Sequence, residues 1–311
     1  MRNWTVLVYM VVQLSVICML GFRHSWFHST LQCPLGLFRL PGMASCRRWL
    51  TCSDTETVEV KELIGLGAVK AVYLASWHGI PVAYSKLNNP AYVDDFAHGL
   101  NMLRMLHPTK HIVQLVGFCK HDILTEYHAN GNAVNIINQF PDLTVRLRLQ
   151  LCLDYALILQ HLHNSPAGTR VLCDSNDLTK LLSQLLVTEE LHLLLNDVDA
   201  LPEVNRRMNK TIKCGHRQLH GTFVAPEQLW PYAHEFRDEE MPGYDEKTDI
   251  WKAASVCEHF LGNVAGSEVI RYSLFSLHKS CKDHNPDMRP TAEQLVVEYR
   301  TLLAEIQNYD L

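Results

Sequence analysis

The sequence contains no internal repeat and no low-complexity tract, and it lacks an excess of positive charge. Of its 311 residues, 28 are lysine or arginine and 33 are aspartate or glutamate, so the formal net charge is −5. We therefore expect no nucleic-acid partner, because nucleic-acid binding depends on a basic surface. Hydrophobic residues make up 47% and charged residues 20%, which is close to an ordinary globular mixture and does not indicate extended disorder.

Charged residues are absent from residues 5–22, TVLVYMVVQLSVICMLGF. A run of this length reaches the lower limit for a membrane-spanning helix. The run lacks the polar face that a core helix would have, so a core helix is disfavoured. No Ala-x-Ala pattern follows that would mark a cleavage site, although a cleaved signal peptide stays an alternative. We expect an uncleaved single-pass signal anchor behind a short cytosolic tail, residues 1–4. The flanking charges, Arg2 and Arg23, do not set its orientation.

Cys-x-x-Cys pairs are also absent from the ten cysteines, which disfavours a zinc finger. Cys33, Cys46 and Cys52 crowd residues 23–57, just after the apolar run. This crowding indicates a disulfide-containing lumenal stem in an oxidising compartment, with the connectivity left open. Asn209 begins an Asn-Lys-Thr sequon and is a candidate glycosylation site if this part of the chain is lumenal.

From Val58 the pattern changes to short β-type runs. VEVKELIG, VKAVYLASW and IPVAYSKL predict three strands, with His78 and Gly79 as a tight hairpin turn. Residues 92–106 have apolar positions at helical spacing, and HIVQLVGFC and DILTEY predict two more strands. Together these elements predict a small β-rich lobe over residues 58–130.

Residues 131–311 are expected to form a larger, mostly helical lobe. Apolar periodicity predicts helices over residues 147–162 and 293–306, and LLVTEELHLLL predicts a hairpin between them. Residues 200–224 form a long irregular segment, of a kind that is usually functional. The order of elements predicts an α+β fold with two lobes.

Three short motifs follow one another in the order and spacing found in protein kinases. Residues 221–227, GTFVAPE, contain the Ala-Pro-Glu that closes a kinase activation segment. Asp249 opens Asp-Ile-Trp, and Arg289 opens an Arg-Pro element near the carboxyl end. In kinases these elements are structural, and we expect Glu227 and Arg289 to form a buried ion pair. Upstream, Gly65 and Gly67 lie between the first two predicted strands; alone they would indicate only a hairpin, but glycines there also let backbone amides approach phosphate oxygens.

The strings CDSNDLTK, KCGHRQLHGTFVAPEQLWP and YDEKTDIWK, with the cysteine-rich stem and the apolar run, resemble the protein O-mannose kinase family of the secretory pathway. The resemblance covers essentially the whole chain and implies a bilobal protein-kinase fold. The implied activity is ATP-dependent phosphorylation of the mannose 6-hydroxyl in an O-mannosyl trisaccharide on α-dystroglycan, with Mg²⁺ or Mn²⁺. The implied location is the endoplasmic reticulum membrane, in type II orientation, with a lumenal catalytic domain.

The lysine that binds ATP phosphates in kinases is missing from the third predicted strand. Ser85 stands at its position, and Lys86 would point to the opposite face of the strand. Lys70, on the second strand, is the expected replacement, unless it is a solvated surface lysine. Its usual glutamate partner falls on Gly99, so we expect Asp95, one helical turn earlier, to pair with Lys70 or else to favour the helix start. The expected ATP site comprises Gly65, Gly67, Lys70, Asp95 and Glu126.

Asp174 corresponds by position to the catalytic aspartate of kinases, which accepts a hydrogen bond from the acceptor hydroxyl. The usual preceding His and Arg are replaced by Leu172 and Cys173. Thr179 stands where the metal-binding asparagine is expected. A carboxylate at the end of an apolar strand is costly unless a cation meets it. The expected metal ligands are therefore Asp197 and Asp199, one of which could instead be a buried, hydrogen-bonded aspartate. Asn176 is expected to take the place of the missing asparagine, with Asp177 as the alternative, unless these two residues cap a turn.

Gln228 and Arg217 are candidate contacts to the sugar substrate, and Trp230 and Tyr232 could stack on it or pack structurally. Cys173 and Cys214 lie in the two site loops, where a disulfide between them would suit a lumenal protein. The missing lysine, His-Arg and asparagine keep one alternative open: a catalytically inactive pseudokinase that binds a glycan or a protein.

Overall fold

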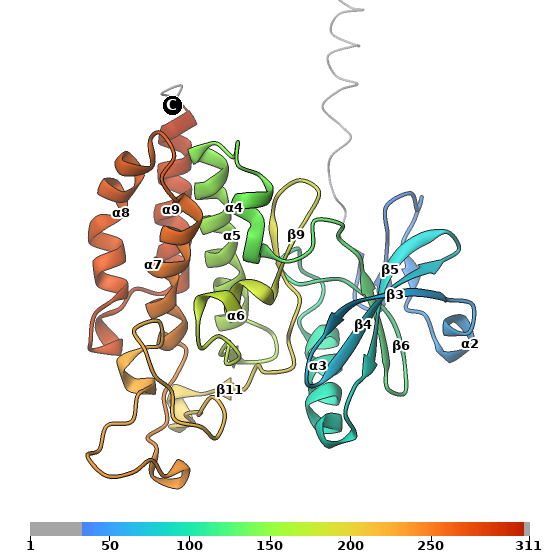
Figure 1. Ribbon diagram of the computed structural model, residues 1–311, viewed down its shortest axis with the longest axis horizontal. Coiled ribbons are helices and arrows are strands. Elements are labelled where there is room, and N and C mark those ends of the chain that lie inside the picture. Colours follow the sequence, from blue (N-terminus) through green and yellow to red (C-terminus); the bar gives the residue numbers. More distant parts are fainter. Residues whose placement is uncertain (1–32, 308–311) are drawn as a thin grey trace, which may run out of the picture. The chain divides into compact units, whose positions relative to one another are not determined.

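The computed structural model describes residues 33–307 (Figure 1). The predicted anchor and cytosolic tail lie outside the described residues. Among the helices that the structure describes, none combines the length and the hydropathy that a bilayer crossing requires. Residues from Pro34 onward belong to one unit, in which a β-sheet lobe and a helical lobe are distinct, so the predicted two-lobed α+β fold is confirmed.

The N-lobe contains a five-stranded antiparallel sheet in the order β3-β4-β5-β7-β6. The predicted hairpin is present: Trp77 pairs with Ile80, and His78 and Gly79 have φ of 49° and 83°. Such positive φ values give the turn a twist that matches the flanking strands. The strands are β3 (Glu59–Leu66), β4 (Lys70–Trp77), β5 (Ile80–Leu87), β6 (Leu115–Cys119) and β7 (Asp122–Glu126).

Helix α3 (Val93–Met105), entered through η1 (Pro90–Tyr92), packs on the sheet where the sequence predicts a helix. Phe96 and Leu103 are buried in one core cluster with Ile123 of β7. The two aspartates of the first helical turn are exposed, where negative charge favours the amino end of a helix. This helix supplies one wall of the cleft between the lobes.

Residues 34–57, within the predicted stem, pack on the N-lobe sheet. Leu50 forms a parallel bridge with Gly117, and a Cβ at Gly117 would lie 2.4 Å from Cβ of Leu50, so only glycine fits there. A disulfide joins Cys52 to Cys119 at the end of β6. Cys33 and Cys46 are disulfide-bonded as well. The short elements of this segment are β1 (Leu37–Phe38), β2 (Arg47–Arg48) and α2 (Cys52–Thr55).

The C-lobe is built around α5, where Thr144 caps the helix by accepting a hydrogen bond from the Leu147 amide. A disulfide between Cys152 and Cys257 ties α5 to α7. Figure 1 shows α5, α7, α8 and α9 gathered on the side away from the sheet. The helices are α4 (Ile136–Gln139), α5 (Val145–His163), α6 (Leu178–Ser183), α7 (Lys247–Leu261), α8 (Ser267–Cys281) and α9 (Ala292–Gln307).

Short strands of the C-lobe carry the loops of the site. The predicted LLVTEELHLLL hairpin is present as β9 and β10, and the β10 amide of Leu193 donates to Asp154, which also pairs with His192 at 2.9 Å. The strands are β8 (Thr169–Arg170), β9 (Leu185–Val187), β10 (Leu193–Leu195) and β11 (Glu203–Val204). The 3₁₀ turns are η2 (Ala133–Asn135), η3 (Arg206–Met208), η4 (Pro226–Gln228), η5 (Asp238–Glu240) and η6 (Pro286–Met288).

Two predicted contacts hold the irregular segment. Arg289, whose side chain is 0% exposed, binds Glu227 through two hydrogen bonds of 2.6 and 2.8 Å. The paired geometry matches the planar guanidinium to the carboxylate. Cys173 and Cys214 form a disulfide that joins the loop after β8 to the segment after β11.

Candidate active site

A cavity of about 260 Å³ lies between the two lobes. Its N-lobe wall comes from the glycine turn, β4, β5, β7 and α3, and its C-lobe wall comes from the loop after β8, α6 and the segment after β10. Two glycines of the turn after β3 and polar residues from both walls line this space. They are Gly65, Gly67, Lys70, Ser85, Asp174, Lys180, Asp197 and Asp199.

Lys70 reaches into the cleft from β4. Side chains alternate along a strand, and Val72, two residues further on and paired with Ser85 of β5, also lines the cavity. Nζ of Lys70 lies 2.7 Å from Oδ1 of Asp197 and 3.2 Å from Oδ2 of Asp199. A lysine on this strand thus reaches the carboxylates that follow β10.

The three charges change one another's proton affinity. Burial acts to lower the pKa of Lys70, but the two carboxylates outweigh it and raise that pKa. Burial acts to raise the pKa of Asp197, but Lys70 holds it below its ordinary value. For Asp199, burial together with the Asp197 charge raises the pKa to about 6. One lysine therefore does not compensate two carboxylates, and the site retains an unmet demand for positive charge.

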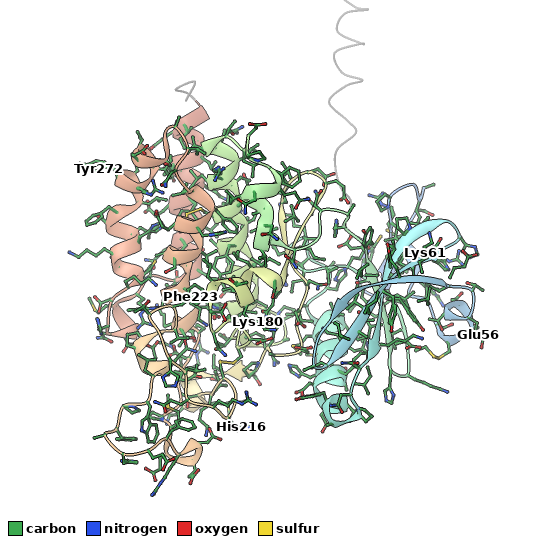
Figure 2. All side chains as sticks on the ribbon, in the orientation of Figure 1. Glu56, Lys61, Lys180, His216, Phe223 and Tyr272 are labelled. Atoms are coloured by element: carbon green, nitrogen blue, oxygen red, sulfur yellow. A yellow bond between two sulfur atoms is a disulfide. The ribbon has the colours of Figure 1, made fainter. Side chains whose placement is uncertain are left out.

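Asp174 lies in the loop after β8, with its carboxylate partly exposed and 2.7 Å from Nζ of Lys180. Lys180 extends from the first turn of α6, which Asp177 caps by accepting a hydrogen bond from the Lys180 amide. Figure 2 shows Lys180 on the side of the C-lobe that faces the N-lobe. Burial acts to lower the pKa of Lys180, and hydrogen bonding to Asp174 raises it above its ordinary value. Sequence reasoning missed this lysine. The available signal was its position on a short helix, six residues after Asp174.

The glycine turn between β3 and β4 covers the cavity. The Gly67 amide donates to the Lys70 carbonyl at 2.8 Å, and the Asn88 side chain donates to the Gly67 carbonyl at 2.8 Å. Added Cβ atoms at Gly65 and Gly67 would meet only ordinary contacts, so their value is an open approach for a ligand rather than relief of a clash.

Residues 58–258 match the protein tyrosine and serine/threonine kinase family. The chain is 47% identical over 288 residues to protein O-mannose kinase of Macaca fascicularis, which covers 89% of this chain and 82% of that relative. It is 46% identical to protein O-mannose kinase of Homo sapiens over the same shares, and 46% identical to that of Xenopus laevis over 88% and 80%. The chain belongs to the protein O-mannose kinase family. It is therefore a kinase, and its kinase domain implies ATP as the phosphate donor.

Two residues of the expected ATP site, Asp95 and Glu126, do not line the cavity. Asp95 is exposed in the first turn of α3 and does not line the cavity, so it is not the partner of Lys70. Gly99 is the position of α3 nearest the site. A Cβ there would lie 3.1 Å from Cβ of Asp199, so the lack of a side chain at Gly99 lets Asp199 approach the helix closely. Glu126 accepts hydrogen bonds from Gln114, the shorter being 2.7 Å, on the face opposite the cavity-lining Thr125.

Asn176, an expected metal ligand, does not line the cavity, yet its amide oxygen is buried without a hydrogen-bond partner among the described residues. Its role stays a prediction. Asp177 is accounted for as the cap of α6.

The expected substrate contacts divide into one buried and one exposed residue. Gln228 is only 1% exposed, and its side-chain oxygen accepts a hydrogen bond from the Ala225 amide, so its expected contact with the sugar is corrected to a structural role in the turn after Ala-Pro-Glu. Arg217 is exposed and stays a candidate. Asn209 is exposed with φ of 51°, which leaves its amide accessible for the predicted glycosylation.

Proposed function

We propose that this kinase transfers the γ-phosphate of ATP to the 6-hydroxyl of mannose in an O-mannosyl trisaccharide carried by α-dystroglycan. One observation carries the enzymatic part: Lys70 from the N-lobe and Asp174, Asp197 and Asp199 from the C-lobe converge on one cleft. The similarity to protein O-mannose kinase over most of both chains supports the acceptor. The identity of the glycan and of its carrier follows from the family resemblance.

In this proposal the N-lobe holds the nucleotide phosphates. The turn containing Gly65 and Gly67 offers backbone amides without side chains in the way. The Lys70 amine, aimed into the cleft, offsets phosphate charge in place of the missing lysine at Ser85. Lys86 is exposed on the strand's other face and takes no part.

The C-lobe orients the acceptor. The Asp174 carboxylate accepts a hydrogen bond from the mannose hydroxyl and aligns it with the γ-phosphorus. It takes the hydroxyl proton as the new O–P bond forms and the bond between the γ-phosphorus and the β–γ bridging oxygen breaks, which releases ADP. Nζ of Lys180 lies 2.7 Å from that carboxylate and brings a second ammonium to the side of the cleft where the phosphoryl group is transferred. Phosphoryl transfer depends mainly on such positioning and on electrostatic stabilisation, so this small set of groups suffices.

The donor set fits a divalent cation. Carboxylate oxygens are the ligands that Mg²⁺ and Mn²⁺ prefer, and the raised pKa of Asp199 indicates negative charge that Lys70 does not balance. Asp197 and Asp199 would hold the ion, with the unpartnered amide oxygen of Asn176 as a third candidate. When bound, the cation supplies neutralisation of the phosphate charge.

The disulfides support a secretory-pathway location. The structure contains Cys52–Cys119, Cys152–Cys257 and Cys173–Cys214, which persist in an oxidising compartment rather than in the cytosol. We propose a lumenal kinase domain in the endoplasmic reticulum, held by residues 5–22 as a type II anchor.

The experiment that tests the function compares wild type with Asp174→Asn, using ATP, Mg²⁺ and a peptide bearing the O-mannosyl trisaccharide. Wild type should transfer phosphate, and Asp174→Asn should lose about 10²- to 10⁴-fold in kcat while still binding ATP. Asp142→Asn, an exposed carboxylate exchange, is the matched control and should keep full activity.

The replacements at Ser85 and Thr179 favour the second candidate, a pseudokinase. No transfer by wild type to the trisaccharide or to a panel of mannose-containing glycans, together with intact glycan binding, would establish that reading instead.

A further inference from the structure

A lysine is buried directly beneath the loop that carries Asp174. Lys252 lies in α7 and is 0% exposed, and Ser175, next to Asp174, is 0% exposed as well. Nζ of Lys252 donates to Oγ of Ser175 at 2.6 Å. No salt bridge to Lys252 is present in the part of the chain that the structure describes, although the charges of Asp249 and Glu227 act on the amine, and its side-chain hydrogen bond goes to this hydroxyl.

The Ser175 hydroxyl is fixed by this contact. The Leu172 carbonyl can only accept, so the Ser175 hydroxyl must donate its hydrogen to it at 2.5 Å, and the serine oxygen then accepts from the Lys252 amine. Ser175 and Leu172 stand on either side of Asp174, and their bond closes a turn that has Asp174 near its tip. The side-chain amide of Gln184 also donates to the Asp174 carbonyl.

The same helix holds the other side of the turn. Asp249, three residues before Lys252 and on the same face of α7, accepts a hydrogen bond from the Leu172 amide at 3.1 Å. One helix therefore presents a carboxylate to Leu172 and an amine to Ser175, the two ends of the turn that contains Asp174. The usual His-Arg pair before the catalytic aspartate is Leu172 and Cys173 here, so neither side chain can form its customary polar contacts.

A role in packing alone does not explain Lys252. Burying an amine costs several kcal/mol, and a well-packed apolar residue of similar volume is often as stable or more stable at such a site. The Lys252 amine also holds the Ser175 hydroxyl in the orientation that donates to the Leu172 carbonyl. What the lysine adds is a single orientation for that hydroxyl and hence for the turn.

We propose that Lys252 is a positioning residue for phosphate transfer, which acts through Ser175 to fix the turn that aims Asp174 at the acceptor hydroxyl. This inference rests on the proposed function of Asp174. Its consequence is that the loss of Lys252 should lower kcat without lowering Tm.

The test uses the full chain with ATP, Mg²⁺ and the trisaccharide peptide. Lys252→Met and Ser175→Ala should each lower kcat by about tenfold to a hundredfold, as expected for a reacting group displaced by about 1 Å. The KM for ATP should stay within about twofold, because the nucleotide groups are untouched, and the Tm of Lys252→Met should not fall. The double variant should lose no more than the single ones, because both remove one unit.

Lys247→Met is the matched control. Lys247 is 8% exposed at the start of the same helix and donates to the Arg289 and Pro290 carbonyls, away from the Asp174 loop. This variant should change Tm but leave kcat close to that of wild type. It separates the loss of any buried lysine from the loss of this one.

A kcat of Ser175→Ala or Lys252→Met near that of wild type would overturn the inference, and so would additive losses in the double variant. If Lys252→Met does not fold, Ser175→Ala alone decides. An inactive wild type would remove the proposed function and this inference together. An active wild type with equally active variants would remove only the inference.

Discussion

Replacing Lys70 by methionine should lower both the free energy of unfolding and the activity, because the same amine meets the carboxylates in the cleft and the phosphate charge of ATP. The amine lies 2.7 Å from Asp197 and 3.2 Å from Asp199, and the three side chains are 19%, 25% and 9% exposed. Removing one partner of a buried ion pair costs about 3–5 kcal/mol, but here protonation of Asp199, whose pKa is already about 6, limits the loss to about 2–4 kcal/mol at pH 7. Urea unfolding of wild type and of Lys70→Met measures this loss in the free energy of unfolding.

The same substitution should lower kcat/KM for ATP by about 10²- to 10³-fold, because the amine no longer meets phosphate charge. Lys86→Met, an exposed lysine on the opposite strand face, is the control and should leave both quantities unchanged. A swap sharpens the test: Ser85 lines the same cavity, so adding Ser85→Lys to Lys70→Met should restore part of the activity. Wild-type kcat/KM in Lys70→Met would refute the assignment of Lys70 to the nucleotide.

Three further outcomes are expected. Glu227→Gln leaves the fully buried Arg289 without its charged partner and should lower the free energy of unfolding by about 3–5 kcal/mol; a loss below about 1 kcal/mol in a urea titration would contradict this. Cys214→Ser opens the bond to Cys173, 41 residues away, and should cost up to about 4 kcal/mol in the oxidised protein but nothing under full reduction, which is the control. Hydrogen bonding to the buried Asp154 raises the pKa of His192. The contribution of this contact to the free energy of unfolding is therefore complete at low pH and is lost as pH rises through the raised pKa. His192→Gln should therefore destabilise the protein at pH 6 more than at pH 8.5, and equal losses at both would count against it.

Local patterns predicted most of the elements and the cleft-facing lysine. The turn at His78 and Gly79 joins strands adjacent in sequence, so nearby residues specify it. Alternation along the strands similarly placed Lys70 of β4 on the cleft face and Lys86 of β5, one residue after the cavity-lining Ser85, on the other face. These inferences held because strand geometry relates a residue to its face without reference to the rest of the fold.

The partner of Lys70 could not be found in this way. Helical spacing showed that Asp95 and Gly99 are one turn apart, but not which turn would be closest to the carboxylates that follow β10. The contact distance at Gly99 depends on how α3 sits against a segment 100 residues away in sequence. For Glu126 the structure likewise adds a contact that spacing could not predict, because its carboxylate accepts hydrogen bonds from Gln114, just before β6.

The sequence by itself determined the family, the order of elements and the motif residues, because each is specified by composition, periodicity or a short string. Only the tertiary structure decided which distant polar side chains meet: Lys70 with Asp197 and Asp199, and Lys252 with Ser175. These pairs join residues up to 129 positions apart, as for Lys70 and Asp199. Electrostatic contacts act over a few ångströms, and that proximity is set by how the lobes and helices pack rather than by spacing along the chain.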